Sequence, residues 1–516
     1  MASRIRLSKV FSCFNEGPAG VLSEIEISQS PGIPTFDVIG LCDSSIRESR
    51  GRIISALNSS GFIMPKGHIT VSISPSYMRK SGTSFDLPIA IGILLVSGQI
   101  NCPPGVKIYA EGELKLTGET RGTPGSAVRL RSIDKDMFDH IIVPEEERES
   151  AVFTGSDAAV IGSLKDITDV VAGRSFSPLT ATSEAERKDE ELINGNAPDL
   201  SVLKGQEKTK RALILAASGF HNILLLGSPG CGKTLAAGMI SSIMPPLSPE
   251  EQRDVYALSD LTGSASRERP FRTIGPGTAL SKITGSSSTL IPGEAVLADH
   301  GILFADEICE MKNEVLDGLR LPMGEHEIRH IKDGKVFRFP ARFLFVGSGN
   351  PCRCGNRFEK DKVCRCTPSV ISRYLSKLSG AFLDRIDIFS EMRSLDAEDL
   401  KSTLGRRTGD ESRRAQETVR RAWDMQKNRY SGDSGNRFNG IREVSSDEDI
   451  FDIIRASEEV REYAVETAGR YELSARGMTR MILLGRTIAD TDGRQDMKVS
   501  DIAEAGAYRS RDLIRR

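Results

Sequence analysis

A glycine-rich segment near the middle of the chain has the residue types and spacing of a phosphate-binding loop. Eight consecutive residues fit the pattern G-x-x-x-x-G-K-[ST]: Gly227, Ser228, Pro229, Gly230, Cys231, Gly232, Lys233 and Thr234. Backbone N–H groups of such a loop and the positive end of the following helix bind phosphate. The lysine reaches the outer phosphates, and the hydroxyl holds Mg²⁺. The alternative is a strand-to-helix turn without a ligand. Because the apolar run 223–226 predicts a strand and 235–244 predicts a helix, motif and context together favour a nucleotide site.

Two carboxylates end a second apolar run. Residues 301–305 are followed by Asp306 and Glu307, which predicts a buried parallel strand with both acids at its carboxyl end. Ligands of open α/β sheets bind at that end. Asp306 is expected to hold Mg²⁺ through water, and Glu307 to orient and polarise the attacking water. Alone the pair is a weak signal, but downstream of a phosphate-binding loop it predicts hydrolysis of a nucleoside triphosphate.

Four cysteines gather in one short segment, at Cys352, Cys354, Cys364 and Cys366. Four thiolates suit tetrahedral Zn²⁺, and the basic residues between them favour the thiolate form. The C-x-C spacing is tighter than the usual C-x₂-C, so reduced free thiols or a redox disulfide are alternatives. The number and clustering of the ligands favour a structural zinc site, close to Asn350 in the sequence.

Two other stretches are candidates for contact with a polyanion. Alternating residues on both sides of Asp333 and Gly334 predict a β-hairpin, and its tip carries Lys332 and Lys335. These lysines can bind phosphate, or they can belong to an ordinary solvated turn. Residues 401–430 contain nine basic and four acidic side chains. A basic helix of this kind can follow a nucleic-acid backbone, or it can face an acidic neighbour or solvent.

Composition limits the class of protein. The chain has 516 residues, enough for about three domains, and its 39% hydrophobic and 27% charged residues are ordinary for a soluble globular protein. A net charge of −2 excludes a global basic field, so contact with nucleic acid must use a local patch. The apolar run 88–96 is too short to span a bilayer, and the first residues lack a signal-peptide core. With an unpaired cysteine inside the loop, we expect a cytoplasmic protein without membrane contact.

The surrounding pattern divides the chain into four parts. Residues 1–176 predict a mixed α/β domain, and 177–199 are polar and charged and predict a linker. Residues 200–395 predict an α/β core, a parallel sheet flanked by helices, because the loop strand and the carboxylate strand are joined by a third apolar strand that ends at Asn350. Residues 396–516 predict a helical lid.

The N-terminal part also carries a family resemblance. The segments concerned are Gly32-Ile33-Pro34, Val38-Ile39-Gly40-Leu41, Ile46-Arg47-Glu48-Ser49-Arg50 and Phe85-Asp86-Leu87-Pro88-Ile89-Ala90. They resemble the N-terminal domain of the ComM/YifB-type, Mg-chelatase-like AAA+ ATPase family. The resemblance also includes the phosphate-binding loop, the Asp306–Glu307 pair and residues 473–477, so it covers nearly the whole chain. It implies an N-terminal α+β domain with the fold of ribosomal protein S5 and the Lon protease domain, then a P-loop AAA+ core, then a C-terminal helical lid of the Mg-chelatase type.

The resemblance implies roles for further residues. Asn350 matches the family's sensor asparagine, which touches the γ-phosphate or the attacking water, although a turn-forming asparagine before proline is the alternative. Arg385 matches the arginine finger, which reaches the nucleotide of a neighbouring subunit. The alternative is that Arg385 only forms a surface salt bridge. Arg476 matches the sensor-2 arginine, expected to reach the γ-phosphate of its own chain from the lid. Residues 270–294, with Lys282, resemble the helix-2 insert of this clade, in which the hairpin projects into a central pore.

A peptidase hypothesis follows from the Lon-like resemblance. Residues 80–84 resemble the segment that holds the Lon nucleophile, so Ser84 is the candidate. A hydroxyl needs a base within hydrogen-bond reach. Lon-like enzymes place a lysine where this chain has Ala127, and Lys107 and Lys115 lie on another segment. We therefore expect a non-catalytic domain that binds or orients a partner.

The sequence thus predicts a cytoplasmic AAA+ ATPase that uses ATP and Mg²⁺, with a structural Zn²⁺ site. An arginine finger that comes from another subunit requires neighbouring copies of the chain, so we expect a homo-hexameric ring. The resemblance implies single-stranded or branched DNA as the substrate, with helicase or branch-migration activity in natural transformation. The alternatives are a chelatase-like or chaperone-like remodeller of a protein partner, and a regulatory binding module that hydrolyses ATP poorly.

Overall fold

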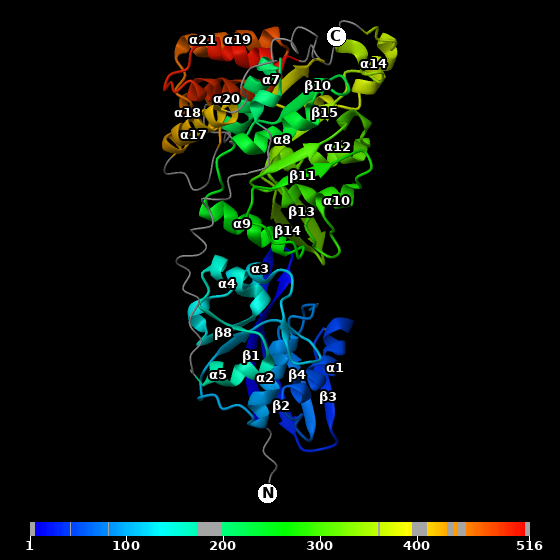
Figure 1. The fold of residues 1–516 in the computed structure, drawn as a ribbon, viewed down its shortest axis with the longest axis vertical. Coiled ribbons are helices and arrows are strands. Elements are labelled where there is room, and N and C mark those ends of the chain that lie inside the picture. The colour runs from blue at the N-terminus through cyan, green and yellow to red at the C-terminus, as the bar shows by residue number, and fades with distance from the viewer. Residues whose placement is uncertain are drawn as a thin grey trace. The chain divides into compact units, whose positions relative to one another are not determined.

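The computed structural model describes residues 6–41, 43–80, 82–172, 199–359, 362–394, 410–430, 438–441 and 450–510. They form two compact units (Figure 1). Unit 1 comprises 1–191 with the inserts 252–267 and 288–291, and unit 2 comprises 192–251, 268–287 and 292–516. The units therefore do not follow chain order as the four predicted parts do. The predicted linker 177–199, except Asp199, lies outside the described residues.

Unit 1 is built on a mixed seven-stranded sheet. Its strands, in spatial order, are β3 (Thr35–Ile39), β4 (His68–Ile73), β2 (Ala19–Ser30), β1 (Arg6–Glu16), β5 (Ile108–Ala110), β8 (His140–Pro144) and β9 (Ala158–Ile161). Antiparallel pairs join β2 to β1 and to β4, and the other pairs are parallel. A separate small hairpin pairs β6 (Glu113–Leu114) with β7 (Thr120–Arg121).

Helices cover both faces of this sheet because its strands alternate. On β1, Val10 and Phe14 join the cluster that contains the apolar helix α2, whereas Phe11 and Cys13 join the other. The helices of unit 1 are α1 (Ser44–Ser59), α2 (Asp86–Ser97), α3 (Ser126–Arg131), α4 (Arg148–Thr154) and α5 (Ile167–Val171). The chain begins α1 where the Asp43 carboxylate accepts a hydrogen bond from the backbone N–H of Ile46.

An insert from the predicted core completes unit 1. From residue 252 onward, helix α9 (Pro249–Asp260) and the chain after it pack on α3 and α4. The ring of Tyr256 stacks on Phe153 with centroids 4.9 Å apart. The Asp260 carboxylate accepts a hydrogen bond from the backbone N–H of Ala127 at 2.9 Å, while its carbonyl accepts one from Gly125. Asp260 therefore caps the start of α3.

Unit 2 contains the predicted parallel sheet. Its strands, in spatial order, are β11 (Phe271–Ile274), β12 (Ile302–Ala305), β15 (Leu344–Gly349), β10 (Ile223–Gly227) and β16 (Ile388–Met392). All four neighbouring pairs are parallel. The carboxyl ends of β10, β12 and β15 consequently meet at one edge. The three central strands are buried along their whole length, which explains their continuous apolar runs.

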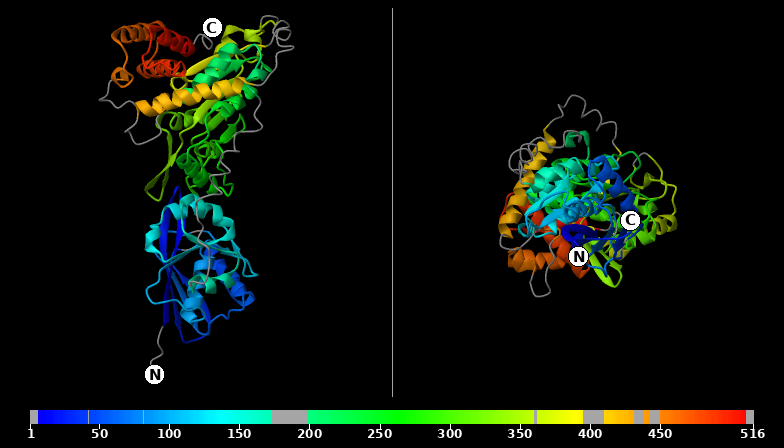
Figure 2. Two further views of the ribbon diagram at one scale, coloured as in Figure 1. Left: turned by 60° about the vertical axis from the view of Figure 1, so that its left-hand side comes forward. Right: turned by 90° about the horizontal axis from the view of Figure 1, so that it is seen from below.

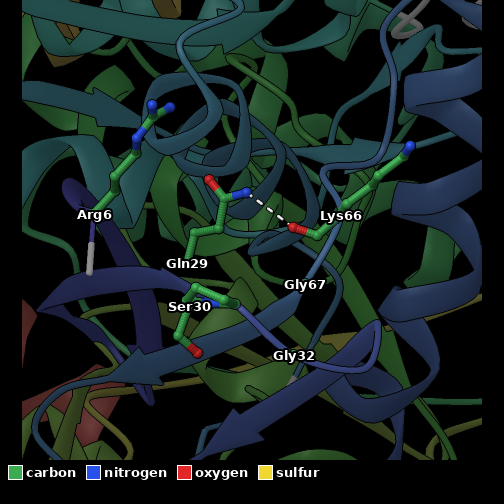
Figure 3. A pocket seen from close by; sticks show the side chains of 7 residues that line it. Arg6, Gln29, Ser30, Gly32, Lys66 and Gly67 are labelled. Carbon is green, nitrogen blue, oxygen red and sulfur yellow. Dashed lines mark hydrogen bonds between the residues drawn. The ribbon is translucent and has the colours of Figure 1, made fainter. Parts of the chain in front are cut away.

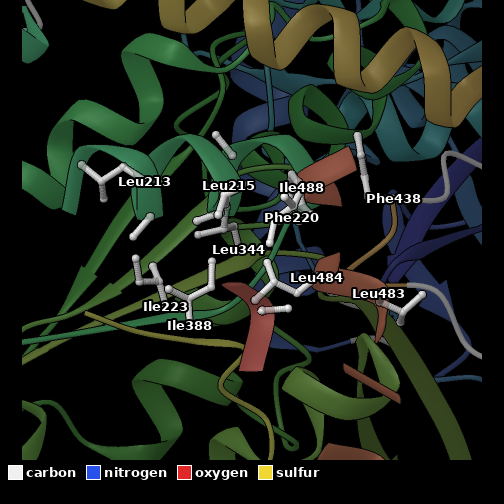
Figure 4. Packing of buried hydrophobic residues seen from close by; sticks show 14 of the residues in the cluster. Leu213, Leu215, Phe220, Ile223, Leu344, Ile388, Phe438, Leu483, Leu484 and Ile488 are labelled. Carbon is white, nitrogen blue, oxygen red and sulfur yellow. The ribbon is translucent and has the colours of Figure 1, made fainter. Parts of the chain in front are cut away.

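The C-terminal helices share one core with this sheet. Figure 4 shows Leu483, Leu484 and Ile488 of α20 packed with Ile223 of β10 and Ile388 of β16. The long helix α17 buries Ala415, Val419 and Ala422, and Figure 2 shows it in orange across unit 2. The indole N–H of Trp423 donates to the carbonyl of Ala217 at 3.0 Å. The predicted lid is thus packed firmly on the loop strand.

The remaining helices of unit 2 surround this core (Figure 1). In chain order the helices of the unit are α7 (Glu207–Gly219), α8 (Lys233–Ile243), α10 (Leu280–Thr284), α11 (Glu294–Leu297), α12 (Asn313–Leu319), α13 (Pro322–Glu325), α14 (Pro368–Leu375), α15 (Gly380–Leu383), α17 (Glu411–Arg429), α18 (Ile450–Ile453), α19 (Glu458–Arg470), α20 (Ala475–Thr491) and α21 (Val499–Arg509). Among the described residues, none of the helices has the length and apolarity that crossing a bilayer requires.

The predicted hairpin is present. Strands β13 (Glu327–Lys332) and β14 (Lys335–Pro340) pair in register, with Lys332 opposite Lys335. The two turn residues Asp333 and Gly334 have φ of 50° and 76°. Positive φ at both positions is what a two-residue turn of the I′ type requires, and Asp-Gly is a preferred pair for it.

Replacing the cap of α3 tests the placement of the insert in unit 1. Asp260→Ala removes a buried acceptor, so we expect a loss of about 1–2 kcal/mol and faster hydrogen exchange at the α3 amides. The matched control is Asp254→Ala on the same helix, whose ion pair with Arg131 is partly exposed and worth less than about 1 kcal/mol. Equal effects of the two substitutions on α3 exchange would contradict the packing.

Candidate functional site

The predicted phosphate-binding loop joins β10 to α8. Gly230 and Gly232 have φ of 82° and 92°, where side chains with a Cβ are strained. At Gly227 the constraint is close packing, because a Cβ there would lie 2.4 Å from the carbonyl oxygen of Met392 on β16. The backbone therefore favours glycine at Gly227 and Gly232, which the motif specifies, and also at Gly230, which it does not.

Lys233 connects this loop to the end of β15. Its ammonium donates to the carbonyls of Gly227 and Ser228 at 2.8 and 2.9 Å, and to Asn350 Oδ1 at 3.2 Å. Burial lowers the pKa of Lys233, while the nearby charges of Asp306 and Glu307 act to raise it. Four residues that the sequence predicts for one site are therefore neighbours.

The carboxylate strand ends beside β15. Ala305 of β12 pairs with Gly347, which brings Asp306 next to Ser348. The fully buried Ser348 hydroxyl donates to Asp306 Oδ1. The backbone N–H of Glu307 donates to the same carboxylate oxygen at 3.1 Å and to Ser348 Oγ at 3.3 Å. Ser348 thus holds both predicted acids in place.

Glu307 has an unusual backbone. Its φ and ψ are 51° and 47°, the left-handed region that costs a non-glycine residue free energy. Such strain concentrates at functional sites, where the surroundings hold it. The conformation exposes the side chain at the edge where Lys233 lies, which suits a carboxylate that orients water.

The remaining loop residues have less distinctive surroundings. Thr234 is the exposed second residue of α8, at the helix end that attracts anions. Its hydroxyl and the Asp306 carboxylate are oxygen ligands of the kind that Mg²⁺ takes. Cys231 is half-buried, and burial raises the pKa of its thiol. Cys231 is therefore a poor nucleophile.

The four cysteines of 352–366 converge. Their sulfurs all lie within 4.8 Å of one another, with measured separations of 3.4, 3.7 and 3.6 Å among Cys352, Cys354 and Cys364. Disulfide sulfurs lie about 2.05 Å apart, whereas Zn–S bonds of about 2.3 Å separate tetrahedral sulfurs by about 3.8 Å. The donor set therefore fits Zn²⁺, and Cys366 would supply the fourth ligand.

This cysteine loop packs directly on the phosphate-binding loop. Gly355, between the second and third cysteines, has φ of 79°, and a Cβ there would lie 2.5 Å from Cδ of Pro229. Further along, Glu359 Oε1 accepts a hydrogen bond from Ser394 Oγ at 2.6 Å, just beyond β16. The geometry of the four cysteines can therefore influence the position of Pro229.

The two predicted arginines interact electrostatically. Burial lowers the pKa of the Arg385 guanidinium, and Arg476 is the neighbouring charge that lowers it most, followed by Arg320 and Arg480. Arg385 Nε donates to the carbonyl of Arg320, and Nη1 donates to the carbonyl of Ala381. Arg476 is exposed in the first turn of α20. A cluster of guanidinium groups suits binding of an anion.

Strand register places Arg385 at the edge opposite the loop. Strand β16 runs parallel to β10 with Ile388 opposite Ile223, so Arg385 precedes the amino end of the sheet. The side chain of Asn222, just before β10, donates to the carbonyl of Arg385 at 2.8 Å. The backbone from Asn222 to Gly227 is about 16 Å long at about 3.3 Å a residue. Arg385 therefore faces away from the loop of its own chain.

The candidates for polyanion contact are on the surface of unit 2. Lys335 and Lys282 are exposed, and Lys332 is half-buried. Beside the two hairpin lysines, Ile331 and Val336 form an apolar cross-strand pair that is 70% and 54% exposed. On α17 the exposed basic residues are Arg413, Arg414, Arg420, Arg421 and Lys427. The basic residues 401–409 lie outside the described residues.

The peptidase candidate Ser84 and the lysines near it have the following surroundings. Ser84 is buried before α2, and the backbone of Ala127 is capped by Asp260. The ammonium of Lys80, also buried, donates to the carbonyls of Pro75 and Met78. Lys115 pairs with Glu119 at 2.9 Å. Lys80 and Lys115 thus have other partners, and the non-catalytic role of this domain stays a prediction.

Unit 1 also has a polar cavity of about 440 Å³. Figure 3 shows Arg6 and Lys66 beside it, with the Gln29 amide donating to the carbonyl of Lys66 at 3.1 Å. None of the residues predicted for ATP hydrolysis lines this cavity.

Sequence reasoning missed Ser348, Asn222 and Asp387. Ser348 stands two residues before Asn350 but becomes significant only because β15 lies between β12 and β10. Asn222 and Asp387 flank strands and bond across them. No local pattern marks these residues, since their role depends on strand order.

Three family descriptions match the sequence. "Magnesium chelatase, subunit ChlI" matches residues 199–400, "Subunit ChlI of Mg-chelatase" matches 25–147, and "Magnesium chelatase, subunit ChlI C-terminal" matches 409–509. These matches include both units and the helices that follow the sheet.

Individual relatives agree with the family matches. Competence protein ComM of Haemophilus influenzae is 31% identical over 98% of this chain and 97% of its own length. Protein YifB of Escherichia coli is 31% identical over 95% of this chain and 94% of its own. The magnesium-chelatase 38 kDa subunit of Cereibacter sphaeroides is 27% identical over 29% of this chain and 52% of its own. The chain therefore belongs to the ComM/YifB-type, Mg-chelatase-like family of AAA+ ATPases.

Proposed function

We propose that this protein hydrolyses ATP with Mg²⁺ at the end of β10. The observation that carries the proposal is the bond from Lys233 to Asn350, beside Asp306 and Glu307. The loop N–H groups and Lys233 bind the phosphates, and Glu307 orients the attacking water. Asn350 holds the γ-phosphate or that water. Thr234 and Asp306 would hold Mg²⁺, which would supply positive charge to the phosphates.

Arg385 and Arg476 serve the nucleotide of a neighbouring copy. Arg385 precedes the opposite edge of the sheet and the charge of Arg476 acts on it, which supports a contact of both with the loop of a second chain. For Arg476 this is an alternative to the expectation that it acts within its own chain. Repetition of a head-to-tail contact closes a ring, and a homo-hexamer is the ring that we propose.

DNA, single-stranded or branched, is the polymer that we propose for this motor. The hairpin lysines and the exposed basic face of α17 offer local positive charge on a chain with a net charge of −2. One full-length relative is named a competence protein, which supports a role in DNA uptake or recombination as a helicase or branch-migration translocase.

A protein partner is the second candidate. The exposed apolar pair Ile331 and Val336 at the hairpin tip favours contact with a polypeptide. The non-catalytic N-terminal unit would then bind or orient that partner. Stimulation of ATP turnover by DNA or by a polypeptide separates the two.

Zn²⁺ at the four cysteines is proposed as a structural ion. It would fix the loop that carries Gly355 against Pro229 and thereby support the phosphate-binding loop. A cytoplasmic location agrees with reduced cysteines.

The ATPase is tested by Glu307→Gln. This change keeps the shape of the side chain but removes its charge, so we expect ATP to bind and turnover to fall by at least about 100-fold. The control is Glu314→Gln on α12, an exposed acid near Lys312, with turnover within about twofold of wild type. Retained turnover in Glu307→Gln would exclude its role.

The proposed DNA substrate is tested in two ways. ATP turnover is measured with and without forked DNA, and the affinity for single-stranded DNA is measured as a function of salt concentration. We expect stimulation, and Lys332→Ala/Lys335→Ala should make the log–log salt slope shallower by about 1.4, because two phosphate contacts are lost. Arg420→Ala/Lys427→Ala on α17 is the matched pair. No stimulation by any DNA at low salt would exclude the helicase, and an effect confined to α17 would exclude the hairpin contact.

Metal analysis of the purified protein tests the zinc site. We expect about one zinc per chain, and a loss of bound zinc in Cys354→Ser and Cys364→Ser but not in Cys102→Ser, which lies in unit 1 outside the cluster. A zinc content near zero in the unmodified protein would end this proposal.

A further inference from the structure

A buried ion pair lies next to the segment that carries Arg385. Asp387, two residues after Arg385, is fully buried, and its oxygens accept hydrogen bonds from Arg480 Nη1 at 3.2 and 3.1 Å. Burial acts to raise the pKa of Asp387, but Arg480, His221 and Arg509 outweigh it and lower the pKa. The pair is therefore charged in the folded protein.

Asp387 also fixes the strand that bears the phosphate-binding loop. One of its oxygens accepts a hydrogen bond from the backbone N–H of Asn222 at 2.9 Å. The side chain of Asn222 in turn donates to the carbonyl of Arg385, and its Oδ1 accepts from the backbone of Phe345 on β15. These hydrogen bonds therefore connect the segment that carries Arg385 to two strands of the sheet, β10 and β15.

Helix periodicity brings Arg476 into the same arrangement. Arg476 and Arg480 are four residues apart on α20 and share one face of the helix. Arg480 donates to Asp387 and to the carbonyl of Gly440 at 3.2 Å. Anchoring Arg480 to Asp387 thus fixes the helix turn that carries Arg476, whose charge acts on Arg385.

We propose that Arg480 and Asp387 are positioning residues that hold Arg385 and Arg476 together as one γ-phosphate receptor for the neighbouring copy. This inference rests on the proposed function of those two arginines. Neither positioning residue needs to touch the nucleotide, because each is bonded to the other. Misplacement by about 1 Å is enough to cost about 100-fold in rate.

A purely structural pair of equal burial provides the control. Arg429 of α17 pairs with Asp490 of the same helix α20, with side chains 12% and 0% exposed, against 13% and 0% for Arg480 and Asp387. Removing either arginine leaves a buried carboxylate, so both changes destabilise the protein. Only the change at Arg480 is expected to affect the chemistry.

The experiment compares Arg480→Gln, Arg480→Lys and Arg429→Gln in full-length protein, measuring ATP affinity, kcat and assembled mass. Arg480→Gln should lower kcat about 100-fold with affinity within about twofold, and Arg480→Lys should recover most of that loss. Arg429→Gln should change kcat less than about threefold. In an Arg385→Ala/Arg476→Ala background, Arg480→Gln should lower kcat by less than a further twofold.

The contrary outcomes are distinct. An equal loss of kcat from Arg480→Gln in both backgrounds, or an equal loss from Arg429→Gln, would show a structural pair and overturn the inference. If Arg480→Gln does not fold, Arg480→Lys is the deciding variant. A kcat close to wild type in a folded protein that binds ATP supports positioning by charge. A loss of kcat as large as that of Arg385→Ala/Arg476→Ala contradicts positioning by charge. Unchanged kcat in Arg385→Ala/Arg476→Ala would instead remove the proposed function of these arginines.

Discussion

Strand β10 links two different sites because it lies inside a parallel sheet, between β15 and β16. Its carboxyl end continues into the loop that holds Lys233, and its amino end follows Asn222, which bonds to the segment of Arg385. A parallel strand keeps these ends about 16 Å apart. The loop that fits a nucleotide and the Arg385 segment proposed to stabilise its cleavage therefore belong to opposite edges, and the complete site that we propose uses two chains.

The chemistry at the loop edge depends on side chains that neighbouring strands deliver. Asp306 follows β12, Asn350 follows β15, and Lys233 begins α8, yet all meet where the strands end. Ser348 joins Asp306 to the N–H of Glu307 and stabilises the left-handed backbone there. The cysteine loop adds a second support through the contact of Gly355 with Pro229.

Local sequence patterns predicted the parts of the molecule whose structure is set locally. The apolar runs before Gly227 and Asp306 became β10 and β12, and Asp333-Gly334 became the turn of a hairpin, because each signal lies within a few residues. Long-range contacts were not predictable in this way. The insert 252–267 packs with α3 and α4 through Tyr256 and Asp260, and the Asp387–Arg480 pair joins residues almost a hundred positions apart.

The central claim is that each chain supplies arginines to the nucleotide of another. It is tested most directly by mixing Lys233→Ala, which lacks a working loop, with Arg385→Ala/Arg476→Ala, which lacks the arginines, and measuring ATP turnover. Each variant alone should be nearly inactive. Mixed assemblies should regain turnover, because an intact loop then meets intact arginines on a different chain. Turnover no higher than the sum of the separate variants, in assemblies shown to contain both, would contradict the account.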